Sequence, residues 1–147
     1  MSFLSSFNIS GSGLTAQKFR MDVISQNIAN AKVTTTEKGT PYRRKMVVLS
    51  SMERKNNKNF RSMYEGVVKA RCGGVQVQSI VEDPSEFVPV YDPKHPNADK
   101  DGYVMYPNVN TVQEMIDMLG ASRAYEANVT AFNATKTMVL KALEIGR

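Results

Sequence analysis

The chain has 147 residues, the length of one domain or at most two, and 41% of them are hydrophobic, which is a lean supply for a core. Its formal net charge of +5 leaves nucleic acid or an anionic membrane open as partners. The single cysteine, Cys72, excludes an internal disulfide framework, and the single histidine, His95, excludes metal motifs built from histidine pairs.

The first predicted element is an amphipathic helix within residues 1–33. Its apolar side chains recur every seven residues in two series, which indicates a seam suited to another helix. We expect contacts with other subunits through six side chains of this helix: Leu14, Met21, Ile24, Asn27, Ile28 and Asn30.

Two polar features interrupt this helical pattern. The Gly-Ser-Gly run at residues 11–13 predicts a break or hinge, since each glycine costs about 1 kcal/mol relative to alanine inside a helix. The firm helix is then expected to begin near Leu14. Asn27 and Asn30 lie three residues apart, so they share one side of the helix near its end. They either cap that end or face another subunit and fix the register of a helix assembly.

The middle of the chain, residues 34–109, predicts a small β-containing unit. It holds all six prolines and five of the nine glycines. Short β-branched runs at 45–50 and 74–81 predict strands. The run 86–93 contains Pro89, which suits an edge strand because proline has no N–H to donate.

Positive charge is concentrated in one part of this middle region. Residues 32–71 carry eleven bases against three acids, whereas residues 72–109 carry two bases against six acids. The polar run 52–61 is typical of an exposed loop. This basic stretch could bind nucleic acid, but no known reader motif accompanies it, so a surface that meets an acidic neighbour is favoured. The expected contacts of this kind are Tyr42, Arg43, Arg44, Asp99 and Asp101.

One segment resembles a calcium-binding loop in its spacing. Asn97, Asp99, Asp101 and Gly102 match the first four ligand and turn positions of an EF-hand, but Asn108 stands where the bidentate glutamate is required. Prolines also occupy the flanks where helices should begin. The pattern therefore favours tight turns, and no metal or other cofactor is expected.

Enzymatic chemistry finds no support in the sequence. No P-loop, dinucleotide fingerprint or nucleophile elbow occurs. His95 has no evident second ligand, and Cys72 has no evident base beside it. We therefore expect neither catalysis nor a small-molecule substrate.

The last predicted element is a helix of about 35 residues within 110–147, long enough to span roughly 50 Å. Asn110 or Thr111 can cap it, and Thr111 with Glu114 has the form of a capping box. Its apolar stripe shifts phase near Gly120 and predicts subunit contacts through the following residues: Val112, Met115, Leu119, Tyr125, Val129, Phe132, Val139 and Leu143.

The predicted fold is mainly α, with long N- and C-terminal helices that pack as a coiled-coil-like pair around a β-rich insert. Residues 1–33 and 110–147 would form one discontinuous helical domain, and residues 34–109 the β-containing middle. Such a chain is either an ordinary helical hairpin that is stable alone or a subunit whose terminal helices pack with those of other subunits. Apolar residues off the main stripe of the last helix, such as Met118 and Leu140, favour assembly.

The sequence resembles the bacterial flagellar axial proteins, and within them the rod proteins. Residues 12–34 resemble the rod-protein signature, with its kernel Asn-Ile-Ala-Asn at 27–30. Residues 39–49, 80–110 and 114–136 resemble the proximal rod type specifically. Together these stretches cover most of the chain.

This resemblance implies a non-enzymatic structural subunit whose terminal helices form a tubular array around the export channel and transmit torque. The implied partners are rod subunits of its own kind, the rod proteins FlgB and FlgF, and the rod–ring adaptor FliE. The implied location is the periplasmic rod of the basal body, reached through the flagellar type III export apparatus.

Two sequence features agree with that route. The first 15 residues lack the basic and apolar segments of a cleaved secretory signal, and no apolar run approaches the roughly 20 residues that cross a bilayer, so membrane insertion is not expected. A small basic nucleic-acid-binding protein remains the alternative from another functional class.

Overall fold

The computed structural model describes residues 3–37, 39–52 and 73–145. Within these residues, two helices and four strands follow one another: α1 (Phe3–Ala29), β1 (Lys45–Ser51), β2 (Val75–Glu82), β3 (Val88–Tyr91), β4 (Tyr103–Tyr106) and α3 (Thr111–Ile145). This confirms a mainly helical chain whose two long terminal helices flank a small β-containing middle. The exposed loop expected at 52–61 falls, apart from Met52, outside the described residues, and so does Cys72.

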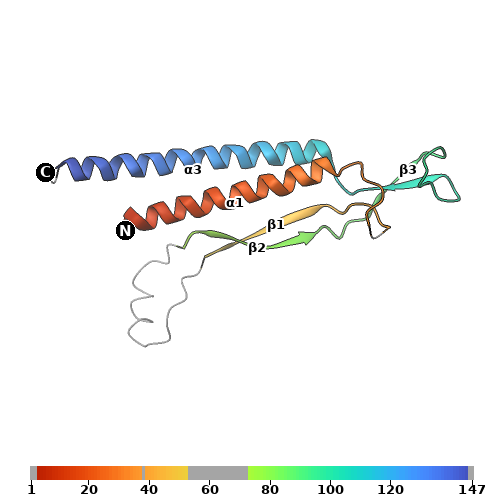
Figure 1. Cartoon of the computed structure of the whole chain (residues 1–147), viewed down its shortest axis with the longest axis horizontal. Coiled ribbons are helices and arrows are strands. Elements are labelled where there is room, and N and C mark those ends of the chain that lie inside the picture. Colours follow the sequence, from red (N-terminus) through yellow and green to blue (C-terminus); the bar gives the residue numbers. More distant parts are fainter. Residues whose placement is uncertain (1–2, 38, 53–72, 146–147) are drawn as a thin grey trace, which may run out of the picture.

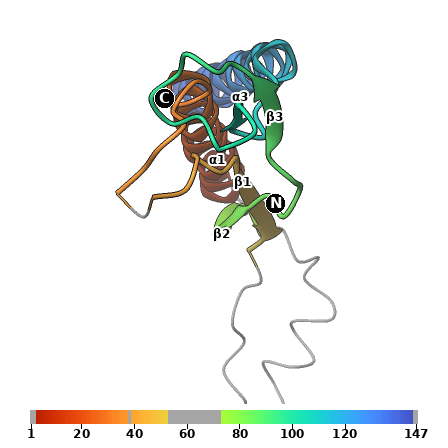
Figure 2. The same cartoon turned by 90° about the vertical axis from the view of Figure 1, so that its right-hand side faces the viewer.

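The elements form three layers with α1 in the middle. Helix α3 runs antiparallel along one side of α1, and strands β1 and β2 lie along the other side (Figures 1 and 2). Strands β3 and β4 lie beyond the end of the helix pair where α1 ends and α3 begins (Figure 1). Among the described residues, the core holds the small or branched side chains of Ala16, Val23, Ile24, Val104 and Ala121. No helix in the described part of the chain is long and apolar enough to cross a membrane.

Helix α1 runs without interruption through residues 11–13, so the predicted hinge is wrong. A Cβ atom added to Gly13 would lie 3.0 Å from Oδ1 of Asn128, which shows that glycine here permits close approach of α3. The hydroxyl of Ser12 accepts a hydrogen bond from the backbone N–H of Val75 at 3.0 Å. The Gly-Ser-Gly run therefore joins α1 to α3 on one side and to β2 on the other, and these contacts outweigh the low helix propensity of glycine.

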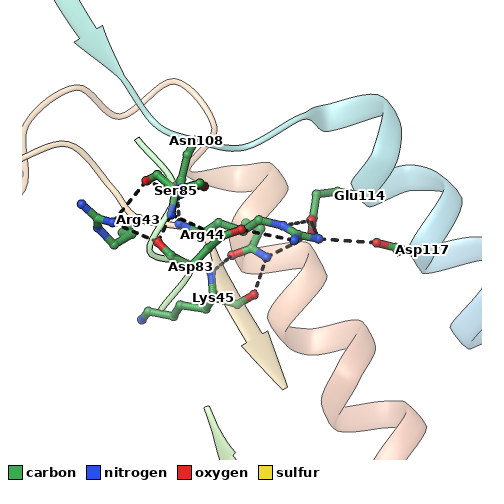
Figure 3. Close-up of polar contacts among 9 residues, drawn as sticks. Arg43, Arg44, Lys45, Asp83, Ser85, Asn108, Glu114 and Asp117 are labelled. Atoms are coloured by element: carbon green, nitrogen blue, oxygen red, sulfur yellow. Dashed lines mark hydrogen bonds and ion pairs between the residues drawn. The ribbon is translucent and has the colours of Figure 1, made fainter. Parts of the chain in front are cut away.

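Helix α3 has the predicted length of 35 residues. Asn110 caps it, because its Oδ1 accepts hydrogen bonds from the backbone N–H groups of Val112 at 3.1 Å and Gln113 at 3.3 Å. The capping box of Thr111 and Glu114 is wrong. The Glu114 carboxylate does not turn back to the helix start but points toward α1 and the chain before β1 (Figure 3).

The surface of α3 that faces α1 carries a series of polar and small residues beside the aromatic ring of Phe132. Its buried members, Glu114, Ala121 and Thr135, are separated by multiples of seven residues, and Asn128, which lies beside Gly13, completes the series. The sequence prediction missed this series because it searched for apolar residues.

The described part of the β-containing middle holds two separate antiparallel strand pairs. Strands β1 and β2 pair from Lys45 opposite Glu82 to Ser51 opposite Val75, with a register shift after Val48. Strands β3 and β4 pair over four residues each. The strands predicted at 45–50, 74–81 and 86–93 are thereby confirmed, whereas β4 was not predicted.

Candidate assembly surface and its buried polar junction

A polar junction connects the end of α1, the start of α3 and the segment that leads into β1 (Figure 3). We call this cluster the junction and define it by Asn27, Tyr42, Arg44, Lys45 and Glu114, which hydrogen bonds link to one another. Two of its polar side chains, those of Asn27 and Glu114, are only 1% exposed. Polar groups buried this deeply must be hydrogen-bonded, because an unmet donor or acceptor costs free energy.

Asn27 uses the full hydrogen-bonding capacity of its side-chain amide. Its Nδ2 donates to the carbonyl of Lys45 at 2.8 Å and to Oε2 of Glu114 at 3.0 Å. Its Oδ1 accepts from the N–H of Lys45 at 3.0 Å and from the hydroxyl of Tyr42 at 2.9 Å. Two donors and two acceptor sites are all that an asparagine amide has. Because Lys45 contributes both its N–H and its carbonyl, Asn27 binds the start of β1 as a residue of a neighbouring strand would.

Glu114 is a buried carboxylate held by a charged partner. Its Oε1 lies 2.6 Å from both Nε and Nη2 of Arg44, and its Oε2 accepts the hydrogen bond from Asn27. Arg44 also approaches Asp83 at 3.6 Å and Asp117 at 3.5 Å. Partial burial acts to lower the pKa of Arg44, but the hydrogen bond and the charge of Glu114, together with these two aspartates, raise it overall.

The phenol of Tyr42 is kept neutral. Burial first, and then the charges of Glu114 and Glu82, raise the pKa of Tyr42 above its ordinary value. The neutral hydroxyl is the form that donates to Asn27.

A turn after β2 supports the junction from outside. The backbone N–H of Ser85 donates to Oδ1 of Asp83 at 2.9 Å, and this bond, with the Ser85 hydroxyl and the Arg44 guanidinium, holds the pKa of Asp83 below its usual range. Nη1 of Arg43 donates to the carbonyls of Asp83 and Ser85, and the Arg43 guanidinium lies 4.6 Å from the centre of the Phe87 ring.

The two asparagines predicted near the end of α1 have different roles. Asn27 lies inside the subunit, so contact with another subunit would require it to leave its four partners. Asn30 is half-buried, and its Nδ2 donates to the carbonyl of Gln26 in its own helix at 2.8 Å, which agrees with a capping role. Ile24 is 6% exposed and belongs to the core. The other residues predicted on α1 are half-buried: Leu14, Met21 and Ile28.

The structure divides the apolar stripe predicted on α3 between two faces. Phe132 faces α1, where its ring meets that of Phe7 edge to face with the ring centres 4.8 Å apart. Half-buried residues of the stripe are Tyr125, Val129, Phe132 and Val139. The remaining members are at least half exposed: Val112, Met115, Leu119 and Leu143.

The exposed apolar surface of α3 includes large side chains outside the stripe that the sequence predicted. At 100° per residue, positions 112, 115, 116 and 119 lie on the side of the helix opposite Glu114 and Ala121. We call Val112, Met115, Ile116 and Leu119 the outer stripe. Toward the end of α3, further large apolar side chains are exposed: Met138, Leu140, Leu143 and Ile145.

The residues predicted as outer contacts of the middle region separate into two groups. Tyr42, Arg43 and Arg44 are engaged within the subunit, as described above. Asp99 and Asp101 are exposed in the connection between β3 and β4. The sequence predicted that the basic residues meet acidic residues of a neighbouring subunit. In the structure, the acidic partners of Arg44 lie inside its own chain.

The segment with calcium-loop spacing forms turns. The N–H of Gly102 donates to the carbonyl of Asp99 at 2.9 Å, and Gly102 has a φ of 79°, a conformation that favours glycine. The side chain of Asn97 binds the hydroxyls of Thr34 and Thr35, while that of Asn108 binds Ser85. In the part of the chain that the structure describes, no three or more His, Cys, Asp or Glu side chains gather as a metal site would require.

A paired set of terminal helices with a small β middle and an exposed apolar stripe defines a structural assembly subunit, and comparison with known families identifies the class. Residues 7–35 match the family described as "Flagella basal body rod protein", and residues 100–145 match "Flagellar basal body rod FlgEFG protein C-terminal".

Curated relatives identify the type of rod protein. The chain is 48% identical to the flagellar basal-body rod protein FlgC of Bacillus subtilis, over 100% of both chains. It is 45% identical to FlgC of Borreliella burgdorferi over 99% of this chain and 98% of the relative, and 40% identical to FlgC of Escherichia coli O6:H1 over 100% of both. The chain therefore belongs to the FlgC family and is a structural subunit of the flagellar basal-body rod, which confirms the resemblance predicted from the sequence.

Proposed function

We propose that this rod subunit assembles through its terminal helices into the tubular array around the export channel and transmits torque there. The observation that carries this proposal is the outer stripe of α3, whose members Val112 and Leu119 are each 60% exposed. Contiguous apolar patches are unusual on proteins that remain monomeric, and they mark surfaces that bind a partner. The function is structural and involves no enzymatic step.

Within each subunit, we propose, the terminal helices pack in a coiled-coil-like manner and form one discontinuous domain of residues 1–33 and 110–147. The seven-residue spacing of Glu114, Ala121, Asn128 and Thr135 along the inner side of α3 supports this packing. Residues 34–109 form the second unit.

The middle unit supplies outer contacts in this proposal. Asp99 and Asp101 are exposed in the turn region of the β3–β4 pair, which extends beyond the helices (Figure 1). A two-stranded pair is marginally stable by itself, so neighbours would stabilise it. Its exposed apolar residues support a contact role: Val88, Val90, Tyr91, Tyr103 and Met105.

The proposed neighbours are further copies of this subunit, the rod proteins FlgB and FlgF, and the adaptor FliE. The proposed location is the periplasmic part of the basal body, and the proposed route is the flagellar type III export apparatus without cleavage of a signal. Membership in the FlgC family supports these assignments.

The outer stripe can be tested by charge. Met115→Lys with Leu119→Lys places two ammonium groups on this surface. In the monomer these charges remain hydrated, whereas in the rod they would be buried at a cost in free energy. We expect the free energy of unfolding of the purified subunit to change by no more than about 0.5 kcal/mol per site. A strain that carries this variant as its only copy should build no rods in electron micrographs of basal bodies and should not swim.

The control is Gln113→Lys, which adds the same charge at an exposed polar position of α3 outside the outer stripe. It should leave rods and swimming intact. Normal rods in the double variant, at wild-type protein levels, would refute assembly through this surface.

A further inference from the structure

We propose that the junction sets the register of α1 against α3, so that Asn27, Arg44 and Glu114 select one of several lengthwise positions that the helix seam allows. This inference concerns the single subunit and does not depend on the proposed mode of assembly.

The seam itself distinguishes poorly between registers. Asn27 lies opposite Glu114, and Gly13 lies opposite Asn128, fourteen residues away along each helix. On α3 the inner residues repeat every seven positions. A slide by seven residues, about 10 Å along the axis, would again bring small side chains of α3 against α1.

Buried residues of α1 share this spacing. Ala16 and Val23 are seven residues apart, so a slide of one heptad exchanges one small apolar neighbour for another. The edge-to-face contact of Phe7 and Phe132 is a further specific pairing along the seam, and it involves no charge. The small residues of the seam therefore favour the native register only weakly, and the contact of Phe7 with Phe132 adds to that preference.

The junction does not tolerate such a slide. Arg44 moves together with α1, because both backbone polar groups of the next residue, Lys45, are bound to Asn27. A slide in one direction would bring Ala121 opposite Asn27 and would separate Glu114 from Arg44. The amide, the carboxylate and the guanidinium would each lose a partner at a site where two of them are 1% exposed.

A slide in the other direction would bring Glu114 opposite Arg20. Arg20 is exposed, so an ion pair there would be weak and screened by water, while Arg44 would again lose Glu114. Separating a buried ion pair costs a factor of about a hundred to a few thousand in population. The native register is thereby favoured over both neighbours.

This role differs from simple stabilisation. Replacing a whole buried ion pair by apolar residues of similar size is often neutral or stabilising, whereas a single buried polar residue in a helix seam can fix register at a cost in stability. Replacing three of the junction side chains together, those of Asn27, Arg44 and Glu114, should therefore preserve folding and release the register.

Disulfide trapping measures the register directly in the full-length protein with Cys72→Ser. Gly13→Cys with Asn128→Cys reports the native register, because a Cβ atom at position 13 would lie 3.2 Å from Cγ of Asn128. Gly13→Cys with Ala121→Cys reports one slid register, and Gly13→Cys with Thr135→Cys reports the other. With an intact junction, mild oxidation should link only the native pair.

The same three cysteine pairs are then placed in the triple variant that combines Asn27→Leu, Arg44→Met and Glu114→Leu. The yield of at least one slid pair should rise tenfold or more, with helical circular dichroism and cooperative unfolding retained. Asn30→Ala serves as the control, because the side chain of Asn30 donates to the carbonyl of Gln26 and not to a junction residue, and it should leave the native pair as the sole product.

Exclusive linkage of the native pair in a folded triple variant would overturn the proposal, and so would absence of that link with the junction intact. If the triple variant does not fold, Glu114→Gln, which removes the charge and keeps the shape, replaces it. Under that substitution slid pairs should still rise above the wild-type level, and a wild-type pattern would again overturn the proposal.

Discussion

Replacing Asn27 by aspartate tests the buried amide with the smallest change of shape. Asn27→Asp removes the amide donor that serves the carbonyl of Lys45 and the carboxylate of Glu114. It also places a negative charge beside the Glu114 carboxylate, whose Oε2 lies 3.0 Å from Nδ2 of Asn27. A buried acceptor left unpaired costs about 1–3 kcal/mol, and an uncompensated buried charge costs about 3–5 kcal/mol. These costs overlap, so we expect a total loss of about 3–5 kcal/mol in the free energy of unfolding at pH 7.

The loss should depend on pH in a defined direction. Burial and the charge of Glu114 raise the folded-state pKa of the introduced carboxyl above its unfolded value of about 3.9. The folded protein then binds a proton more readily than the unfolded chain does, so the penalty is smallest below about pH 4 and grows as pH rises through the folded-state value. Urea unfolding followed by circular dichroism at pH 7 and at about pH 4 measures both quantities.

Asn30→Asp is the matched control, since it makes the same change directly after α1, at a half-buried position whose side chain donates to the carbonyl of Gln26. Its cost should be about 1 kcal/mol or less, from the unfavourable position of an anion near the end of a helix. Equal losses for the two variants, or a loss at Asn27 that does not vary with pH, would refute the assignment of Asn27 to a fully used buried amide.

Two other predictions follow from the helix seam and from the turn after β2. Gly13→Leu should cost about 1–3 kcal/mol in thermal unfolding, because its side chain would displace Asn128. Gly11→Leu should cost no stability, because a Cβ atom added at Gly11 would meet no neighbouring side chain or strand within 4 Å. Equal losses of stability for the two variants would contradict the close-approach argument. Because the N–H of Ser85 lowers the pKa of Asp83, the stability that this group contributes is present above about pH 4 and is lost as pH falls through the lower folded value. Asp83→Asn should therefore flatten the stability profile in acid, and an unchanged acid slope would count against this contribution.

The secondary structure could be predicted where the pattern is local. Both helices and three of the four strands follow from periodicity, β-branched runs and proline placement. Strand β4 was missed because it has only four residues and follows a run of Asp, Asn and Gly that indicates turns. The hinge at residues 11–13 was predicted wrongly because glycine propensity is a local quantity, whereas the contacts of Gly13 with Asn128 and of Ser12 with Val75 are made across the fold.

The candidate site was predictable only in part. Asn27 stood out because asparagine is unfavourable inside a helix, but its partners lie 15 to 87 residues away in the sequence. No periodicity connects Asn27 to Glu114 or either of them to Arg44. The capping motif predicted a local backbone partner for Glu114. Its carboxylate instead accepts a hydrogen bond from the guanidinium of Arg44, in the segment before β1.

The distribution of side chains on α3 explains why a search for apolar periodicity could not separate the two faces of this helix. Its inner side carries Glu114, Ala121 and Thr135, while the outer stripe carries large apolar groups. A helix that served only its own subunit would place these groups the other way round. Within the subunit, close approach and hydrogen bonds hold the helix pair, so the apolar area of the outer stripe stays available. On the proposed function, burial of that apolar area favours assembly, and a rod can form without first opening the subunit.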